Sequence, residues 1–243
     1  MTRITFLLLM VAAMVVPCAG TAAEARLLRT PTVSARHVAF VHANDVWVAA
    51  RDGGEARRLT TFAGAETDPH FSPDGTLLAF SGEYDGNTDV YVVPVEGGEP
   101  RRLTWHPYPD NVRGWTNDGS AVVFASGRTT VPRPQPKLWT VALEGGMPET
   151  LPLPRAADAS FSPDGLRLAY QVVEPWEAEW RNYRGGQANP VRIVDLQTLD
   201  VLRLPWDGSN DQSPVWLDGT VFFLSDRDWA MNVWAYDTAL GTV

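Results

Sequence analysis

Short runs of apolar residues, each bounded by glycine, proline or aspartate, follow one another along most of the chain. The clearest set lies in residues 68–104, where residues 77–81 and 89–95 are rich in β-branched and aromatic side chains. Runs of this length with these boundaries are typical of antiparallel strands. A Ser72-Pro73-Asp74-Gly75 segment precedes the first run, and its proline and glycine suit a type I turn. Residues 68–104 therefore predict a meander of four short strands.

The same arrangement recurs along the chain at an interval of 44 to 55 residues. The repeat is marked by an aromatic residue directly before each turn, at Phe71, Trp115, Phe161 and Trp216. A four-stranded unit of about this length cannot cover both of its own apolar faces, whereas radial packing of several units covers them. The pattern predicts an all-β fold, a β-propeller built from four-stranded antiparallel blades.

Five blades can be drawn along the chain, and the fifth is incomplete. They occupy residues 31–60, 68–104, 112–153, 159–204 and 213–243. The last blade ends after its third strand, which would leave an unpaired sheet edge and an uncovered apolar face. We therefore expect either that this chain is part of a longer protein or that its ring is completed by something outside the chain.

The first 23 residues have a different character. Arg3 precedes an apolar run over residues 4–16, and small residues follow before Glu24. The run is shorter than the roughly 20 residues that span a membrane, so residues 1–23 predict a cleaved signal peptide and export to the periplasm or the exterior. Residues 24–243 then form the propeller. Cys18, the single cysteine, leaves with the leader; a lipid anchor on it is the alternative.

Charge and motif content narrow the partners. The formal net charge of −9 opposes binding to phosphate backbones, so we expect no nucleic-acid partner. No apolar run after the leader is long enough to span a membrane. The four histidines lack metal-site spacing and the Gly-Gly pairs lack the lysine of a phosphate loop, so we expect no metal and no cofactor. The ten tryptophans are expected mainly to pack between blades.

One insertion interrupts the repeats. Residues 174–190 separate the second and third strands of the fourth blade and contain aromatic residues, arginines and paired glycines. Long loops on rigid scaffolds often carry function. Arg181, Tyr183 and Arg184 are accordingly candidate peptide or channel contacts, since a guanidinium can bind a peptide carboxylate through two hydrogen bonds. The alternative is structural: the aromatic residues cover the ring and the arginines pair with nearby carboxylates.

Several segments together resemble one family. They are residues 45–47 (Asp-Val-Trp), 82–91, 180–186 (Trp-Arg-Asn-Tyr-Arg-Gly-Gly) and 223–228. In combination they resemble the amino-terminal six-bladed propeller of tricorn-type proteases, serine peptidases of the tail-specific class. The Phe-Ser-Pro-Asp-Gly repeats at 71–75 and 161–165 are similar to TolB and WD40-like blades in general.

The resemblance implies six blades in the full protein and a role in the passage of peptides. It also implies that a second propeller, a PDZ-like domain and a catalytic core follow, and that the catalytic serine and histidine lie there. We therefore assign no catalytic residue to this chain. The implied partners are peptides, the downstream domains and a possible homo-oligomer.

Two other interpretations stay open. A periplasmic TolB-like binding scaffold has similar blades, although the interval between Ala23 and Val33 leaves no room for the domain that precedes its propeller. A prolyl-oligopeptidase-like or amidohydrolase-like enzyme can also carry such a propeller. The sequence beyond Val243 would discriminate among them.

Overall fold

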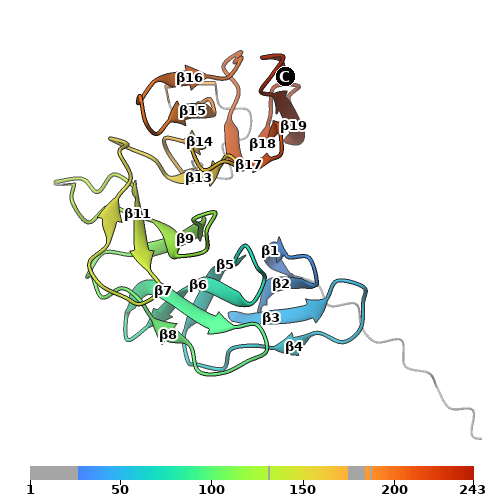
Figure 1. Ribbon diagram of the computed structural model, residues 1–243, viewed down its shortest axis with the longest axis vertical. Coiled ribbons are helices and arrows are strands. Elements are labelled where there is room, and N and C mark those ends of the chain that lie inside the picture. Colours follow the sequence, from blue (N-terminus) through green and yellow to red (C-terminus); the bar gives the residue numbers. More distant parts are fainter. Residues whose placement is uncertain (1–26, 131, 175–183, 187) are drawn as a thin grey trace, which may run out of the picture.

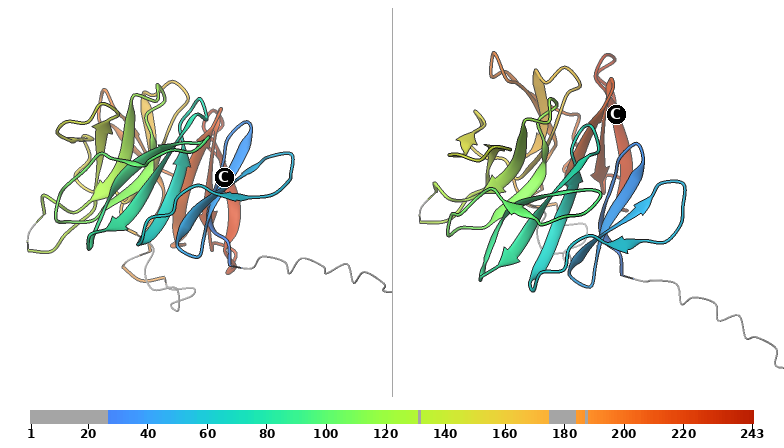
Figure 2. Two further views of the ribbon diagram at one scale, coloured as in Figure 1. Left: turned by 90° about the horizontal axis from the view of Figure 1, so that it is seen from below. Right: turned by 60° about the horizontal axis from the view of Figure 1, so that its bottom comes forward.

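The computed structural model describes residues 27–130, 132–174, 184–186 and 188–243. Within these residues the chain forms strands, turns and loops, and the strands make five antiparallel sheets. The sheets follow one another in chain order around a common centre (Figure 1). Two further views show them standing side by side as blades (Figure 2). The predicted all-β propeller with five blades is confirmed.

The first three blades each contain four strands in simple meander order. Blade one consists of β1 (Arg29–Val33), β2 (His37–His42), β3 (Asp45–Ala50) and β4 (Arg57–Arg58). Blade two consists of β5 (Ala65–Phe71), β6 (Leu77–Tyr84), β7 (Asn87–Pro94) and β8 (Arg101–Arg102). Blade three consists of β9 (Asp110–Trp115), β10 (Ala121–Ser126), β11 (Lys137–Ala142) and β12 (Glu149–Thr150).

Blade four also has four strands, whereas blade five has three. Blade four consists of β13 (Asp158–Phe161), β14 (Arg167–Gln171), β15 (Arg192–Asp195) and β16 (Val201–Arg203). Blade five has three strands, β17 (Asp211–Leu217), β18 (Thr220–Ser225) and β19 (Asn232–Asp237). The predicted leader, residues 1–23, lies outside the described residues, and no described helix has the length and apolar character of a membrane span.

The predicted turns have the hydrogen bonds of type I turns. Gly75 and Gly165 donate their N–H groups to the carbonyl oxygens of Ser72 and Ser162, each at 2.8 Å. Both glycines have φ near +70°, at 72° and 71°, which is strained for residues with a side chain. The glycine at the fourth turn position is therefore required by the backbone and does not mark a ligand site.

The outer strands β4 and β8 are shorter than the sequence predicted. The prediction extended them through Thr60 and Thr104, but the ladder ends two residues earlier. Thr60 Oγ1 accepts the N–H of Val46 at 3.0 Å, and Thr104 Oγ1 accepts that of Val90 at 3.0 Å. The hydroxyl thus replaces a backbone acceptor and ends the strand with a side-chain hydrogen bond.

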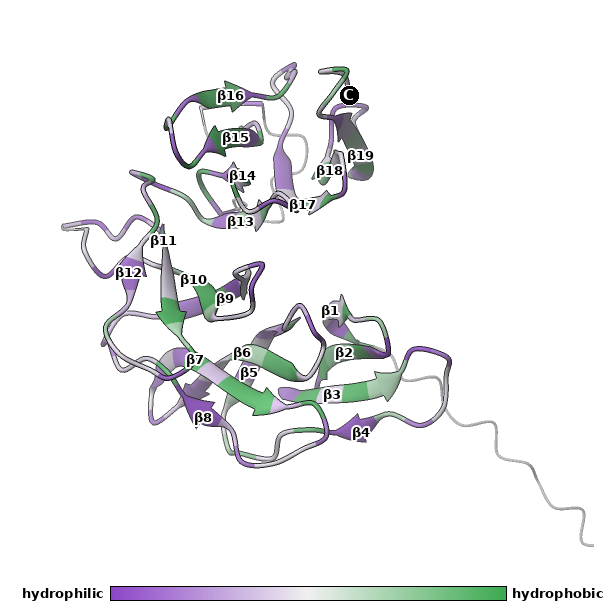
Figure 3. Ribbon diagram, in the orientation of Figure 1, coloured by the Kyte–Doolittle hydropathy of each residue, from purple (hydrophilic) through white to green (hydrophobic). Residues whose placement is uncertain are grey.

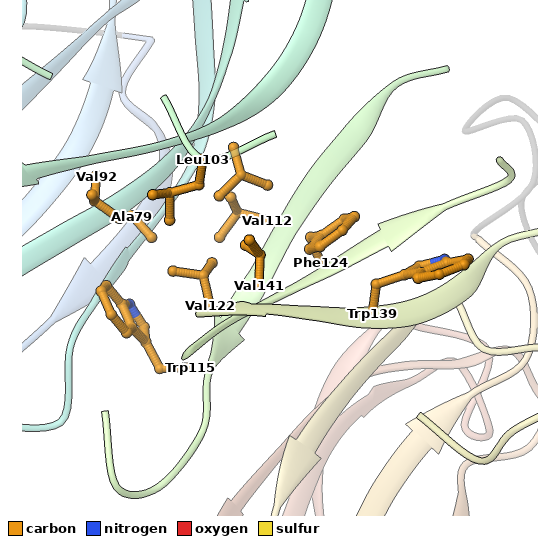
Figure 4. Close-up of a cluster of buried hydrophobic side chains, with 10 residues drawn as sticks. Ala79, Val92, Leu103, Val112, Trp115, Val122, Phe124, Trp139 and Val141 are labelled. Carbon is orange, nitrogen blue, oxygen red and sulfur yellow. The ribbon is translucent and has the colours of Figure 1, made fainter. Parts of the chain in front are cut away.

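The core consists of four apolar clusters, each between two consecutive blades. Figure 4 shows the cluster in which Val92 and Leu103 of blade two pack against Val112, Phe124 and Trp139 of blade three. Colouring by hydropathy shows the hydrophilic outer strands β4, β8 and β12 beside apolar central strands such as β3 and β7 (Figure 3). Each blade therefore covers the apolar face of its neighbour, as the repeat pattern predicted.

The tryptophans follow the predicted packing only where they lie in repeated strands. Trp115, Trp139 and Trp216 are buried between blades, at 7–8% exposed. Trp105 and Trp229 lie in loops and are 64% and 66% exposed, so they are exceptions to the packing expected of most tryptophans. The interblade position, rather than the residue type, decides burial.

Blade five leaves one face uncovered. Trp216, Val221 and Phe223 pack against blade four. The alternating residues on the other face are exposed, with Val215 at 56% and Val233 at 69%. An apolar sheet face of this kind is normally covered by another layer.

Candidate functional site: the axial channel

A cavity, which we call the channel, lies at the centre of the blades. It has a volume of about 1110 Å³ and is lined by residues of all five inner strands, β1, β5, β9, β13 and β17. Pockets for small molecules typically enclose about 300–1,000 Å³. The channel therefore has room for a ligand larger than a single ion or a small metabolite.

The inner strands bend where they line the channel. In four of the five blades the inner strand shifts its pairing register with the second strand. Three of these shifts contain an X-Pro pair, at residues 30–31, 68–69 and 213–214, and proline has no N–H for a ladder hydrogen bond. In blade three the extra residue is Arg113. Such bulges redirect side chains and are frequent beside functional sites.

Arg113 connects three blades at the channel wall. Its Nε donates to the carbonyl oxygen of Ala157 at 2.9 Å, and Nη2 donates to Glu174 Oε1 at 3.0 Å. Nη1 donates to the carbonyl oxygen of Val112 at 3.0 Å and lies 3.4 Å from Asp68 Oδ2. The planar guanidinium is thus held in one orientation by groups from blades two, three and four.

Asp158 lies beside this arginine but has a weaker set of partners. The half-buried carboxylate accepts the N–H of Ala159 at 2.9 Å. Burial raises the pKa of Asp158 to about 6, Arg113 partly offsets this effect, and Asp68 and Glu174 add to it. The environment therefore makes the charged form of Asp158 costly, and the residue is still ionised above pH 7.

His70 also lines the channel and carries no charge at neutral pH. Burial lowers the pKa of His70 to about 4, and the nearby Arg113 acts in the same direction, while Asp68 opposes the shift. Among the described residues, the channel wall at this level then holds the carboxylates of Asp68, Asp158 and Glu174 against one guanidinium. The net charge of these described residues is negative.

The sequence patterns did not single out these channel residues. In the sequence, His70 is only one of four histidines that lack metal-site spacing. Asp68, Arg113 and Asp158 share one signal, since each lies three or more residues before a turn, in the strand nearest the axis. The described residues contain no group of three side chains placed to hold a metal ion.

The predicted contacts in the insertion lie elsewhere. Arg181 and Tyr183 fall outside the described residues. Arg184 Nη2 donates to the carbonyl oxygen of Asp226 at 2.7 Å, and Nη1 lies 3.0 Å from Asp226 Oδ1. The guanidinium carbon is 4.7 Å from the centre of the Trp229 ring. Arg184 is thus paired with a carboxylate of blade five, and it is not among the described residues that line the channel.

Comparison with known proteins places this geometry in a family. A family model for the tricorn protease N-terminal β-propeller domain matches residues 25–243. Tricorn protease homolog 1 of Streptomyces coelicolor is 35% identical over 205 residues, 83% of this chain and 19% of that protein. A tricorn protease homolog of Saccharolobus solfataricus is 26% identical over 219 residues, 85% of this chain and 19% of that protein. The chain spans about a fifth of the length of these curated relatives.

Solved structures show the same fold. The crystal structure of the tricorn protease matches with a TM-score of 0.75 at 22% identity, over 87% of this chain and 21% of that one. TolB from Acinetobacter baumannii matches with a TM-score of 0.69 at 22% identity, over 87% of this chain and 52% of that one. At these identities the likeness concerns the blades and their arrangement.

Proposed function

Since this chain belongs to the tricorn protease N-terminal β-propeller family, we propose that its channel passes peptides to or from a catalytic core elsewhere in a longer, exported serine peptidase. The channel carries the proposal, because its volume of about 1110 Å³ and its lining by five inner strands suit an extended chain. Export rests on the leader-like character of residues 1–23.

The exposed face of blade five supports a longer ring. Val215 and Val233 are more than half exposed on a sheet that otherwise resembles its neighbours. A sixth blade packed against this face would cover these two valines, just as each of the other blades covers the apolar face of its neighbour. The downstream domains of the same polypeptide are then the first partners of the propeller.

Arg184 is proposed as a peptide contact near the junction of blades four and five, and the same role is proposed for Arg181 and Tyr183, which lie outside the described residues. The Arg184 side chain is 22% exposed, and Asp207, its more distant carboxylate neighbour at 3.9 Å, is 58% exposed. An incoming carboxylate would take the place of Asp207 while Asp226 keeps the guanidinium oriented. Peptide turnover by the Arg184→Ala variant tests this contact, and unchanged kinetics on several peptides would refute it.

The passage of peptides is tested by narrowing the channel in the full-length protein. Asn111 lines the channel on β9, and Asn111→Trp would add a bulky ring to its wall. Thr150 lies exposed on the outer strand β12, so Thr150→Trp is the matched control. We expect kcat/KM for peptides to fall at least about tenfold in Asn111→Trp, because blocking the route removes productive encounters, and to stay unchanged in Thr150→Trp. Equal kinetics in both variants would overturn the proposed function.

A further inference from the structure

We propose that the channel prefers peptides that carry positive charge, and that Asp158 is the residue that receives an ammonium or guanidinium group in it. The inference rests on the proposed function and adds the charge class of the peptide. It follows from the cavity, from the charges on its wall and from the partners that these charges already have.

The charges of the described wall residues do not balance. Asp68, Asp158 and Glu174 line the channel with Arg113, and His70 is neutral above about pH 4. Three carboxylates against one guanidinium leave a local excess of negative charge. A cleft with low-dielectric walls concentrates ions of the opposite sign, so a cationic peptide segment is favoured over an anionic one.

The single cation of this cluster is already engaged. Arg113 donates to two backbone carbonyls and to Glu174, and it lies 3.4 Å from Asp68. An anionic ligand would have to compete with both carboxylates for the same donors. The guanidinium is therefore a structural link between blades and a poor receptor for a peptide carboxylate.

Asp158, in contrast to Arg113, has few hydrogen-bond partners among the described residues. An ionised carboxylate has about four lone-pair positions for hydrogen bonds, and among the described residues the one donor to the Asp158 side chain is the adjacent Ala159 N–H. No described cation lies within ion-pair distance of Asp158, whereas Asp68 and Glu174 both lie near Arg113. Asp158 thus retains acceptor capacity on the channel wall, where a charged donor from a peptide would pair with it.

The test compares two peptides on the full-length protein at pH 8 and low salt. One probe is an acetylated and amidated hexapeptide with two lysines, and the other has glutamates in their place; both are made from D-amino acids so that they resist hydrolysis. Dissociation constants are measured by calorimetry. We expect the lysine peptide to bind at least about tenfold more tightly than the glutamate peptide, with the difference shrinking at high salt because of screening.

Two variants locate the effect. Asp158→Asn keeps the shape of the side chain and removes its charge, and Glu149→Gln removes one charge from the exposed outer strand β12. We expect Asp158→Asn to weaken binding of the lysine peptide about three- to tenfold, as for loss of a charge-assisted hydrogen bond, and Glu149→Gln to leave it unchanged. Equal affinity for both peptides, no binding of either, or an unchanged Kd in Asp158→Asn would overturn the inference.

The outcome is separable from the proposed function. If Asn111→Trp slows peptide turnover but Asp158→Asn does not alter the preference for lysine, the channel passes peptides without this charge selection. If Asn111→Trp has no effect on turnover, the proposed function itself fails, whatever the peptides bind.

Discussion

Blades two and three hold a buried carboxylate at the same place, near the start of the inner strand, but they neutralise it differently. In blade three Asp110 pairs with Arg128, whose side chain is 9% exposed. In blade two the corresponding acid, Glu66, faces Tyr84, which occupies the position of Arg128, four residues after the second-strand phenylalanine. The buried acid at this site is therefore stabilised by an ion pair in blade three and by a hydroxyl group in blade two.

In blade three, the arginine of the ion pair lies between two aromatic rings. The guanidinium carbon of Arg128 lies 5.1 Å from the ring centres of both Phe124 and Trp139. Blade five repeats the arrangement, with Arg227 at 5.0 Å from Phe223 and Trp234 and paired to Asp211. Cation–π contacts add to the ion pair where water is excluded.

In blade two, the buried acid accepts hydrogen bonds from several neutral donors. Glu66 accepts the N–H of Val46 at 2.8 Å and hydrogen bonds from the hydroxyls of Thr60 and Tyr84. Burial raises the pKa of Glu66, although these hydrogen bonds oppose the shift. Without a cation, Glu66 has a pKa above its usual value, so its charged form is more costly in the fold than in water. The comparison teaches that one buried acid can be held by a charge partner or by several neutral hydrogen-bond donors.

The largest expected effect is from Asp110→Asn. The variant leaves the enclosed Arg128 without its counter-charge, and removing one partner of a buried pair costs about 3–5 kcal/mol. Hydrogen exchange of the β9, β10 and β11 amides in the full-length protein measures this loss. Adding Arg128→Met to the same chain should recover part of it, because no buried charge then remains. Exposed ion pairs contribute less than about 1 kcal/mol to stability. A cost of that size for Asp110→Asn would show that blade three does not depend on a buried ion pair.

An intermediate effect is expected from Gly82→Ala. An added Cβ would lie 2.9 Å from Cδ2 of Tyr91, closer than real Cβ contacts, and 3.0 Å from Cε2 of Tyr84, tighter than most of them. Overpacking of this kind costs about 1–3 kcal/mol. Blade three has Ser126 at this position, whose hydroxyl lies 3.5 Å from Nε of Arg128, so Ser126→Ala should cost no more than about 1 kcal/mol. Thermal melting of the two variants compares them, and equal shifts would show that the tyrosine pair does not require glycine.

The smallest effect, and the one with a pH signature, is expected from Glu66→Gln. The folded-state pKa of Glu66 is raised above 4.5, so its contribution to stability is complete below that pH and is lost as pH rises through the folded value. Glu66→Gln should therefore cost about 1 kcal/mol at acid pH and less at neutral pH. Urea unfolding at several pH values checks the sign. A cost that grows with pH would mean that the folded-state pKa of Glu66 is lowered rather than raised, which would contradict the prediction.

The repeat made much of the fold predictable. The aromatic residue before each turn and the Pro-Asp-Gly segments recur closely enough to predict five blades, and their turns lie where expected, as at Gly75 and Gly165. The exceptions concern side chains that replace backbone partners, such as Thr60 at the end of β4. Local patterns do not reveal such replacements, because the N–H group of Val46 that Thr60 satisfies lies 14 residues away.

The sequence by itself determined the strands, their turns and their grouping into blades, because these depend on hydrophobic period and turn chemistry within about 40 residues. Only the tertiary structure decided what lines the channel. Asp68, Arg113 and Asp158 follow one another at intervals of 45 residues in the chain and meet because successive inner strands converge on one axis. Their charges interact through that convergence, which no local pattern of apolar and polar residues encodes.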